Sequence, residues 1–246
     1  MAKSLETNLR HEIKLLISYA DYVALSRKLS TVMDKDKYTL EQGDYFIRSL
    51  YLDDIYDSAY HEKVSGSDNR RKYRIRIYNN SDKVIKLERK EKFGARIKKT
   101  SCSITREIYD EYMAGNPAPL LDVGHPLADE VYTLARSKQL SPCVIVDYDR
   151  EAYVHPLANT RLTFDKALHA SITSYDIFED NITTMPIFPY GSVIFEVKYD
   201  DFLPAHLASM ISTVNGHKMS LSKFCLCRDK LIESNFTTKG LNRIMF

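Results

Sequence analysis

The stretch RRKYRIRIY (residues 70–78), followed by NNSD (79–82) and VIKLERKE (84–91), decides the fold. In both long runs, charged and apolar residues alternate at a spacing of two, and residues i and i+2 of a β-strand point to the same side. The Asn-Asn-Ser-Asp segment between the runs has a composition typical of a hairpin turn. The stretch therefore predicts two paired strands with cations on one face and apolar side chains on the other.

Charged and apolar residues alternate in the same way at several other places in the chain, and the charged residues are mostly basic. These segments are residues 10–14, 148–150, 161–165 and 196–198. Each segment taken singly fits a solvated strand face, where Lys and Arg are common. Together they predict a sheet whose polar side surrounds a basic cavity. Because guanidinium groups bind phosphate oxygens in pairs and ammonium groups act as point charges, such a cavity suits a polyanion.

Apolar periodicity and turn residues predict the remaining elements, which mix strands with helices. Further strands are expected at residues 12–17, 45–52, 97–103, 144–148, 152–154, 160–164 and 193–199. Helices are expected at residues 20–33, 53–63, 104–113, 127–138, 204–214 and 221–233, and a loop at residues 176–189. No Ser- and Gly-rich linker divides the chain, so residues 1–246 are interpreted as a single α+β domain. Its sheet is expected to be a mostly antiparallel barrel of about eight strands with surrounding helices.

The composition is that of a globular protein, with 44% hydrophobic and 28% charged residues in a chain of 246. The formal net charge of +2 argues against general coating of nucleic acid, which requires a strongly basic surface. Lys and Arg are instead concentrated between residues 70 and 99. No segment approaches the roughly 20 apolar residues that span a bilayer, and the first residues lack the apolar core of a signal peptide. A cytoplasmic location is therefore expected.

The four cysteines have no spacing that indicates a disulfide framework, so reduced thiols are expected. Cys225 and Cys227 could bind a metal as a pair. No second pair and no nearby His cluster in the sequence supports that interpretation.

A series of short motifs follows in an order typical of a known family. The motifs are Arg-His-Glu-Ile-Lys (10–14), Tyr-x-Leu-Asp (51–54), Tyr-x-Glu-Lys (60–63), Arg-x-Arg (74–76), Leu-Glu-Arg-Lys (87–90), Asp-Tyr-x-Arg (147–150), Arg-x-Thr-x-Asp (161–165), Phe-Glu-x-Lys (195–198) and Ser-Lys-Phe (222–224). With these motifs the chain resembles the VTC domain over nearly its whole length. That domain is the polyphosphate polymerase module of the triphosphate tunnel metalloenzyme superfamily. The resemblance implies a closed antiparallel eight-stranded barrel around a basic tunnel.

Carried over to the matching positions, the resemblance implies a role for individual residues. The residues assigned to catalysis, where they hold the reacting phosphates, are Arg74, Arg76, Lys90 and Arg150. Those assigned to phosphate or nucleotide binding are Lys14, Lys98, Tyr148, Arg161, Lys198, Ser222 and Lys223. Lys99 competes with Lys98 for the same role across the turn at Gly94. Glu196 is assigned to a divalent cation, Mn²⁺ or Mg²⁺, that bridges phosphate oxygens.

The activity implied by the resemblance is that of a metal-dependent ATP:polyphosphate phosphotransferase. The end of a polyphosphate chain would attack the γ-phosphorus of ATP, and ADP would leave. No protein nucleophile is required, because fixed cations and a metal can position the reactants and neutralise charge. Arg10 stands where other members of the superfamily carry the first Glu of Glu-x-Glu-x-Lys. The loss of that carboxylate favours a transferase over a hydrolase that activates water.

Two other functions remain open. One is a triphosphate hydrolase of the same fold, and the other is a non-catalytic polyphosphate or nucleotide sensor of a membrane partner. Glu12 and Glu88 fit either metal binding or salt bridges with the surrounding cations. The expected partners are ATP and inorganic polyphosphate, with no nucleic acid and no direct membrane insertion. A membrane-protein partner would place the chain peripherally at the inner face of the membrane, and the sequence does not indicate the oligomeric state.

Overall fold

The structure, a computed structural model, describes residues 10–94, 96–218, 220, 222–234 and 236. These residues form two compact units, each assembled from separate segments of the chain. Unit 1 contains the described parts of segments 1–45, 149–167 and 188–221. Unit 2 contains those of segments 46–148, 168–187 and 222–246. The long strands β7 (Ser141–His155) and β8 (Thr160–Ser171) contribute residues to both units.

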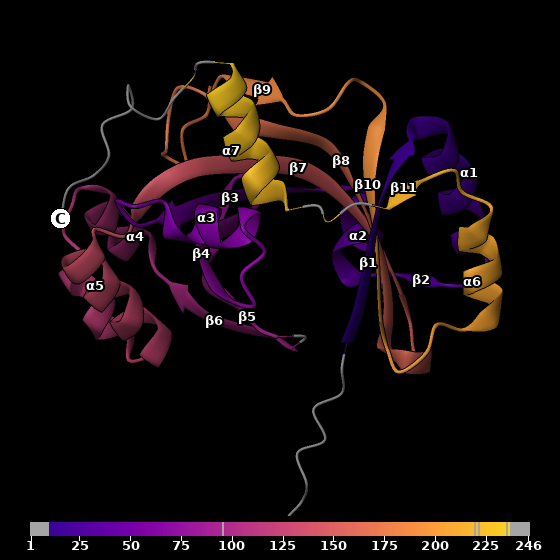
Figure 1. The fold of residues 1–246 in the computed structure, drawn as a ribbon, viewed down its shortest axis with the longest axis horizontal. Coiled ribbons are helices and arrows are strands. Elements are labelled where there is room, and N and C mark those ends of the chain that lie inside the picture. Colours follow the sequence, from indigo (N-terminus) through magenta and orange to yellow (C-terminus); the bar gives the residue numbers. More distant parts are fainter. Residues whose placement is uncertain (1–9, 95, 219, 221, 235, 237–246) are drawn as a thin grey trace, which may run out of the picture. The chain divides into compact units, whose positions relative to one another are not determined.

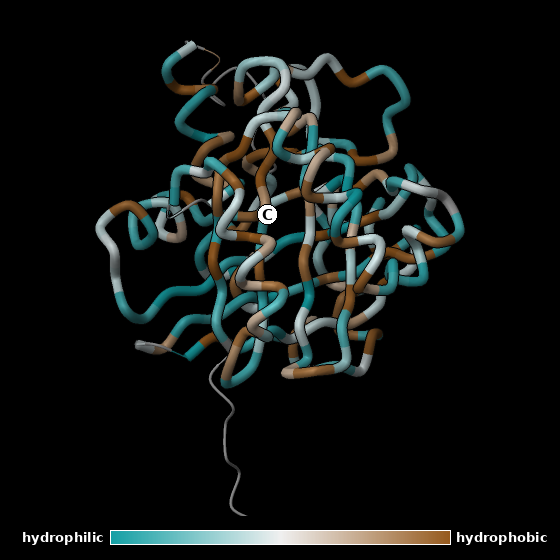
Figure 2. Tube along the Cα trace, turned by 90° about the vertical axis from the view of Figure 1, so that its right-hand side faces the viewer, coloured by the Kyte–Doolittle hydropathy of each residue, from teal (hydrophilic) through white to brown (hydrophobic). Residues whose placement is uncertain are grey.

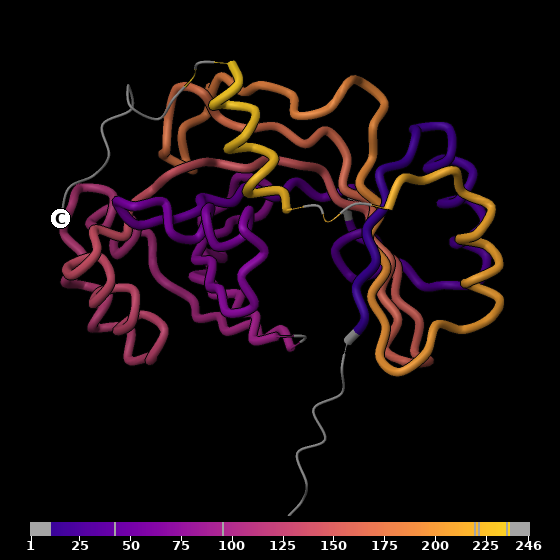
Figure 3. The backbone as a smooth tube through the Cα atoms, viewed as in Figure 1, coloured from indigo at the N-terminus to yellow at the C-terminus, as the bar shows by residue number. Residues whose placement is uncertain are grey.

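Unit 1 combines antiparallel strands with two packed helices. Its elements are β1 (Arg10–Ser18), α1 (Tyr19–Leu29), β2 (Asp34–Lys35), α2 (Lys37–Gln42), a 3-10 helix (Leu157–Asn159), β10 (Ser192–Asp200), α6 (Ala205–Ser212) and β11 (His217–Lys218). β1 runs beside β10, as the indigo and orange stretches of Figure 3 show, and β10 pairs with β8. Apolar residues alternate along β8 and β10, so Phe164 and Phe195 stack with ring centroids 4.8 Å apart. Helices α1 and α6 lie next to each other (Figure 1), and Leu25 of α1 joins the same core.

Unit 2 is built around a meander of four strands. Its elements are β3 (Tyr45–Asp53), α3 (Ser58–Val64), β4 (Asn69–Tyr78), β5 (Ser81–Phe93), β6 (Arg96–Ile104), α4 (Arg106–Met113), a 3-10 helix (Ala118–Val123), α5 (Pro126–Lys138), β9 (Thr184–Pro186) and α7 (Lys223–Glu233). The hairpin of β4 and β5 turns at Asn79 and Asn80, whose φ angles of 52° and 51° are those that a type I′ turn requires. Ile75, Leu87 and Val131 are fully buried together, so the apolar face of the meander packs on α5. Figure 2 shows brown and teal stretches following one another along the extended segments of the chain.

The strands pair in the order β11-β1-β10-β8-β7-β3-β4-β5-β6, with β2 added beside β7 and β9 beside β8. All registered pairs are antiparallel, which confirms the α+β class and the antiparallel sheet. The expectation of a closed barrel of eight strands is wrong. Among the described residues the sheet has 11 strands, and β11 and β6, at the two ends of the order, do not pair with each other. The edge strand β11 pairs with β1 through Leu15 and Leu16.

Three short strands account for the difference between the eight strands expected and the 11 observed. β2, β9 and β11 have two or three residues each, which is too short for an alternation of period two to be recognised. The predicted strands at residues 144–148 and 152–154 are parts of the single strand β7. The helix predicted at residues 20–33 ends at Leu29, and helix α2 was not predicted. The expected loop at residues 176–189 contains β9.

Candidate phosphate-binding site

One face of the β4-β5-β6 meander in unit 2 carries three of the basic residues assigned from the sequence, Arg74, Arg76 and Lys90. Register pairs Arg74 with Glu88, and it pairs Lys90 with Lys72 on one side and Lys99 on the other. Residues directly opposite in an antiparallel sheet point to the same side. We call this surface the basic face of unit 2; it comprises Lys72, Arg74, Arg76, Lys86, Glu88, Lys90 and Lys99. Among these residues, six are cations and Glu88 is the one acid.

Glu88 lies between two of the cations. Its carboxylate Oε2 accepts a hydrogen bond from Arg74 Nε at 2.6 Å, and its Oε1 forms an ion pair with Lys99. Burial alone would raise the pKa of Glu88, but the charges of Arg74, Arg76 and Lys99 lower it to about 2. Arg74 also donates to the hydroxyl of Tyr51 at 3.1 Å. Glu88 is therefore a salt-bridge partner that holds Arg74 in place.

The register places Lys98 and Lys99 on opposite faces of the sheet. Lys98 is opposite Glu91, and therefore points to the other side of the sheet from Arg74. Lys99 is opposite Lys90 and contacts Glu88, so it belongs to the basic face. The position on this face that the sequence analysis gave to Lys98 is occupied by Lys99, because a shift of one residue along a strand exchanges its two faces.

Arg76, Tyr148 and Lys223 come together from three elements of unit 2. Arg76 is 6% exposed, and it donates from Nε to Ser49 Oγ at 2.9 Å and from Nη2 to the Tyr148 hydroxyl at 3.1 Å. The Nζ of Lys223, in the first turn of α7, lies 4.9 Å from the centroid of the Tyr148 ring. The three residues were assigned to phosphate contacts from separate motifs, and the fold makes them neighbours.

The start of α7 brings a fourth assigned residue to the same face. Ser222 is the N-cap residue of α7, and its Oγ lies 2.8 Å from the Nζ of Lys72. Phe224 stacks on Tyr51 with ring centroids 5.1 Å apart. Burial would raise the pKa of the Tyr51 hydroxyl, but the charges of Arg74 and Arg76 lower it. Tyr51 and Lys72 had no role in the sequence analysis, although the motif at residues 51–54 and the alternation of β4 contain them.

A separate pocket of about 310 Å³ lies within unit 2. Asp53, Arg71, Tyr73 and Leu134 are among the residues that line it. Both charge signs are present, and none of the residues assigned from the sequence lines it. The pocket therefore adds nothing to the phosphate site.

Unit 1 presents a face on which cations and carboxylates are mixed. Register places Glu12 and Lys198 opposite each other, and likewise Lys14 and Glu196, on β1 and β10. The Nζ of Lys14 lies 2.8 Å from Glu12 Oε1 and 3.5 Å from Glu196 Oε1, and that of Lys198 lies 3.1 Å from Glu196 Oε1. Burial would lower the pKa of Lys14, but the charges of Glu196 and Glu12 raise it above its usual value. We call this surface the mixed face of unit 1.

The two assigned arginines of unit 1 also have carboxylate partners. Arg150 binds Asp165 through two hydrogen bonds, Nε to Oδ1 at 2.6 Å and Nη2 to Oδ2 at 2.8 Å. The Nη2 of Arg161 lies 2.6 Å from Oδ2 of Asp36, the N-cap residue of α2. The pKa of Asp36 is lowered: burial opposes this, but hydrogen bonds from Thr39 and the charge of Arg161 outweigh burial. Every cation assigned to unit 1 thus lies beside an acid.

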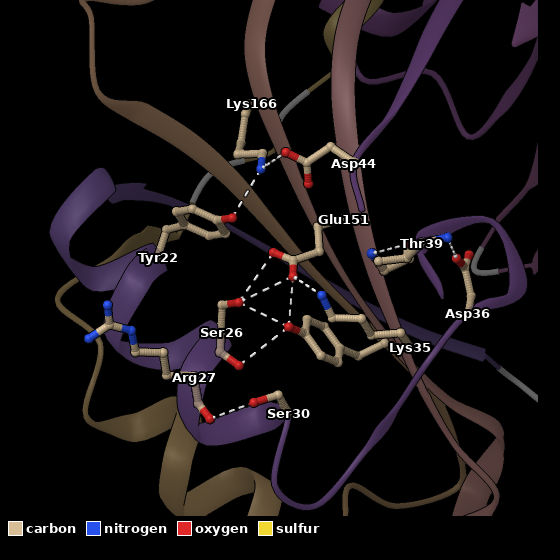
Figure 4. Close-up of polar contacts among 12 residues, drawn as sticks. Tyr22, Ser26, Arg27, Ser30, Lys35, Asp36, Thr39, Asp44, Glu151 and Lys166 are labelled. Atoms are coloured by element: carbon tan, nitrogen blue, oxygen red, sulfur yellow. Dashed lines mark hydrogen bonds and ion pairs between the residues drawn. The ribbon is translucent and has the colours of Figure 1, made fainter. Parts of the chain in front are cut away.

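The opposite side of the sheet in unit 1 holds a second polar network, drawn in Figure 4. Glu151 accepts hydrogen bonds from the hydroxyls of Ser26 at 3.2 Å and Tyr153 at 2.7 Å, and Lys35 Nζ lies 3.3 Å from its Oε1. This network fastens α1 to β7. Since successive residues of a strand point to opposite sides, Arg150 lies on the mixed face while Glu151 lies under α1.

Comparison with protein-family models identifies the family of the chain. The model of the VTC domain matches residues 9–232. The chain belongs to the VTC domain family. This family is associated with polyphosphate polymerase, which gives the chain a polyphosphate-related or triphosphate-binding role.

The VTC domain was also compared with curated proteins and with solved structures. None of the curated proteins matches it. A proposed adenylate cyclase from Bacillus halodurans has 13% identity and a TM-score of 0.43, covering 84% of this chain and 86% of that chain. A conserved hypothetical protein from Pyrococcus furiosus has 12% identity and a TM-score of 0.40, covering 83% and 86%. Because both TM-scores are below 0.5, these likenesses support no conclusion.

No helix in the described part of the VTC domain has the length and the apolar composition needed to cross a membrane.

The VTC family implies a divalent cation, and the mixed face of unit 1 offers oxygen atoms that fit one. Thr163 is in register with Glu196, and its Oγ1 is buried without a hydrogen-bond partner among the described residues. Within the same described ranges, no group of three or more His, Cys, Asp and Glu could hold a metal. Mg²⁺ and similar ions, however, are commonly bound by one or two carboxylates together with substrate phosphates. Glu196, with Thr163 beside it, would hold such an ion, which would neutralise charge on phosphate oxygens.

Proposed function

We propose that this VTC domain is an ATP:polyphosphate phosphotransferase that extends an inorganic polyphosphate chain with the γ-phosphate of ATP. The observation that carries the proposal is the charge imbalance on the basic face of unit 2, where one carboxylate accompanies six cations. Like charges on adjacent strands repel each other, so this face is stabilised when it binds a polyanion. A phosphate chain carries negative charge on every unit and can contact several strands at once.

The geometry supports phosphoryl transfer by positioning and charge neutralisation. A terminal oxygen of the polyphosphate chain forms a bond to the γ-phosphorus of ATP. The bond from this phosphorus to the β–γ bridging oxygen breaks, and ADP leaves with that oxygen. Arg74 and Arg76 would bind the oxygens of the transferring group, because guanidinium groups match phosphate geometry and spread its charge. Glu88, Tyr51 and Ser49 hold these guanidinium groups in place before substrate arrives.

The test is incubation of the purified protein with ATP and Mn²⁺, followed by gel staining for polyphosphate and an assay for released phosphate. Chains that lengthen with time support the proposal. Phosphate release without chains would indicate a hydrolase. Binding of tripolyphosphate without turnover would indicate a sensor. The matched variants are Arg74→Ala, which should slow synthesis by roughly a hundredfold or more, and Lys83→Ala, which should not slow it. Lys83 is exposed near the β4–β5 turn and lies outside the basic face.

A further inference from the structure

Lys72 of β4 is a cation of the basic face that no motif assigns. Its side chain is half-buried and extends to the start of α7, where its Nζ lies 2.8 Å from Ser222 Oγ. The same Nζ lies 5.1 Å from the centroid of the Phe224 ring and 4.0 Å from Cys225 Sγ. All these partners are uncharged groups or weak acceptors. Among the residues that the structure describes, no carboxylate forms an ion pair with Lys72.

The charged neighbours of Lys72 are mostly other cations. Lys90 is opposite it on β5, Arg70 precedes it by two residues on β4, and Lys63 belongs to α3. The Tyr51 hydroxyl and the Cys225 thiol act in the opposite direction and favour the charged form of Lys72. Burial, with a smaller contribution from Lys63 and Arg70, lowers the pKa of Lys72 to about 8. A buried ammonium group among like charges is unfavourable unless an anion joins it.

Ser222 can serve such an anion together with Lys72. A serine hydroxyl has one donor and two acceptor sites. Here Ser222 Oγ accepts from Lys72 Nζ, and it caps α7 by accepting from the backbone N–H of Cys225 at 3.5 Å. The hydroxyl proton of Ser222 can therefore be donated to a ligand. The ammonium group and the hydroxyl therefore both present donors to one anionic oxygen cluster.

Resting on the proposed function, we propose that Lys72 is a further substrate-binding residue, which binds a phosphate group of the oligophosphate together with Ser222. This phosphate lies at the start of α7, beside the phosphates that Arg74 holds. Tyr51, stacked on Phe224, fixes the segment that carries Ser222 against β3. The ligand class is an extended oligophosphate, because a single phosphate cannot reach both places.

Binding of the phosphate to Lys72 should depend on pH. The phosphate binds the protonated form of Lys72, so bound ligand raises the pKa of this group above its value in the unliganded protein. Affinity should then be greatest below pH 8 and should decrease as pH rises through 8 to 9. A difference of about one pKa unit corresponds to roughly a tenfold loss of affinity. Ionisation of the tripolyphosphate in this window is the same for every variant, so the difference between the wild type and Lys72→Arg reports the ionisation of Lys72.

The experiment is titration calorimetry with tripolyphosphate alone, without metal or ATP, at pH 7 and pH 9. The variants are Lys72→Met, Lys72→Arg and the control Lys83→Met, each checked for folding by circular dichroism. We expect Lys72→Met to weaken binding about tenfold at pH 7 and to remove the decrease in affinity toward pH 9. Lys72→Arg should restore binding and show no decrease in affinity toward pH 9, and Lys83→Met should match the wild type.

Two outcomes separate the inference from the function on which it rests. If the wild type binds tripolyphosphate and Lys72→Met binds equally well, the role of Lys72 is refuted while the proposed function stands. If the wild type does not bind tripolyphosphate at all, the proposed function fails and the inference fails with it.

Discussion

The basic face of unit 2 and the mixed face of unit 1 use the same residue types in opposite ways. In unit 1, Lys14, Arg150, Arg161 and Lys198 each lie beside a carboxylate. On the basic face of unit 2, Glu88 is the one carboxylate beside six cations. Paired charges are held in place by the protein itself, whereas unbalanced ones need a ligand. We therefore propose that the charges of the mixed face serve mainly structure and metal binding, and those of the basic face serve phosphate binding.

The largest effect is expected in unit 2 from Arg74→Ala. Removing a preorganised charged donor from a phosphoryl-transfer site should lower the turnover number by roughly a hundredfold or more. The measurement is the initial rate of polyphosphate synthesis from ATP, with Lys83→Ala as the control. Synthesis that continues at the wild-type rate in Arg74→Ala would contradict the role of the basic face.

In unit 1 the expected effect of a comparable change is on stability. Asp165→Asn leaves Arg150 partly buried without its bidentate partner, which should lower the free energy of unfolding by about 3 kcal/mol. Thermal unfolding of the variant and of Lys90→Met, which removes an exposed cation of unit 2, gives the comparison. If Lys90→Met lowers the free energy of unfolding as much as Asp165→Asn does, the hypothesis that the charges of unit 1 are the structural ones is contradicted.

Glu196→Gln tests the metal-binding part of the comparison. The amide is a weaker ligand than the carboxylate, so the Mn²⁺ concentration required for half-maximal synthesis should rise about tenfold. Binding of tripolyphosphate without metal should change little, because the basic face of unit 2 remains complete. A variant with unaltered dependence on Mn²⁺ would remove Glu196 from the metal site.

The smallest effect is expected from Lys99→Met, set against Lys98→Met. Lys99 belongs to the basic face, so its loss should weaken tripolyphosphate binding about threefold, as the loss of one partly exposed charge does. Lys98 points to the other side of the sheet, and its loss should leave the affinity unchanged. Calorimetry at two salt concentrations makes the difference clearer, because screening reduces only the contribution of Lys99.

The hairpin of β4 and β5 was predictable because its alternation is long and its turn residues are typical. The eight long strands follow from the same signal. Lys98 was assigned in place of Lys99 because the face of a strand after a turn depends on the register, and one residue exchanges the faces. The partner of Arg161 could not be predicted either, since Asp36 lies far from it in sequence and is brought close by the pairing of β2 with β7.

Glu88, which forms an ion pair with Arg74, competes with phosphate for this guanidinium group. An arriving phosphate meets a guanidinium group that already holds a carboxylate, so the net gain from contact is the difference between two similar interactions. A polymer held by such contacts dissociates from each of them readily. In the proposed polymerase, whose product advances by one unit in each cycle, this carboxylate would favour the release of each phosphate from Arg74.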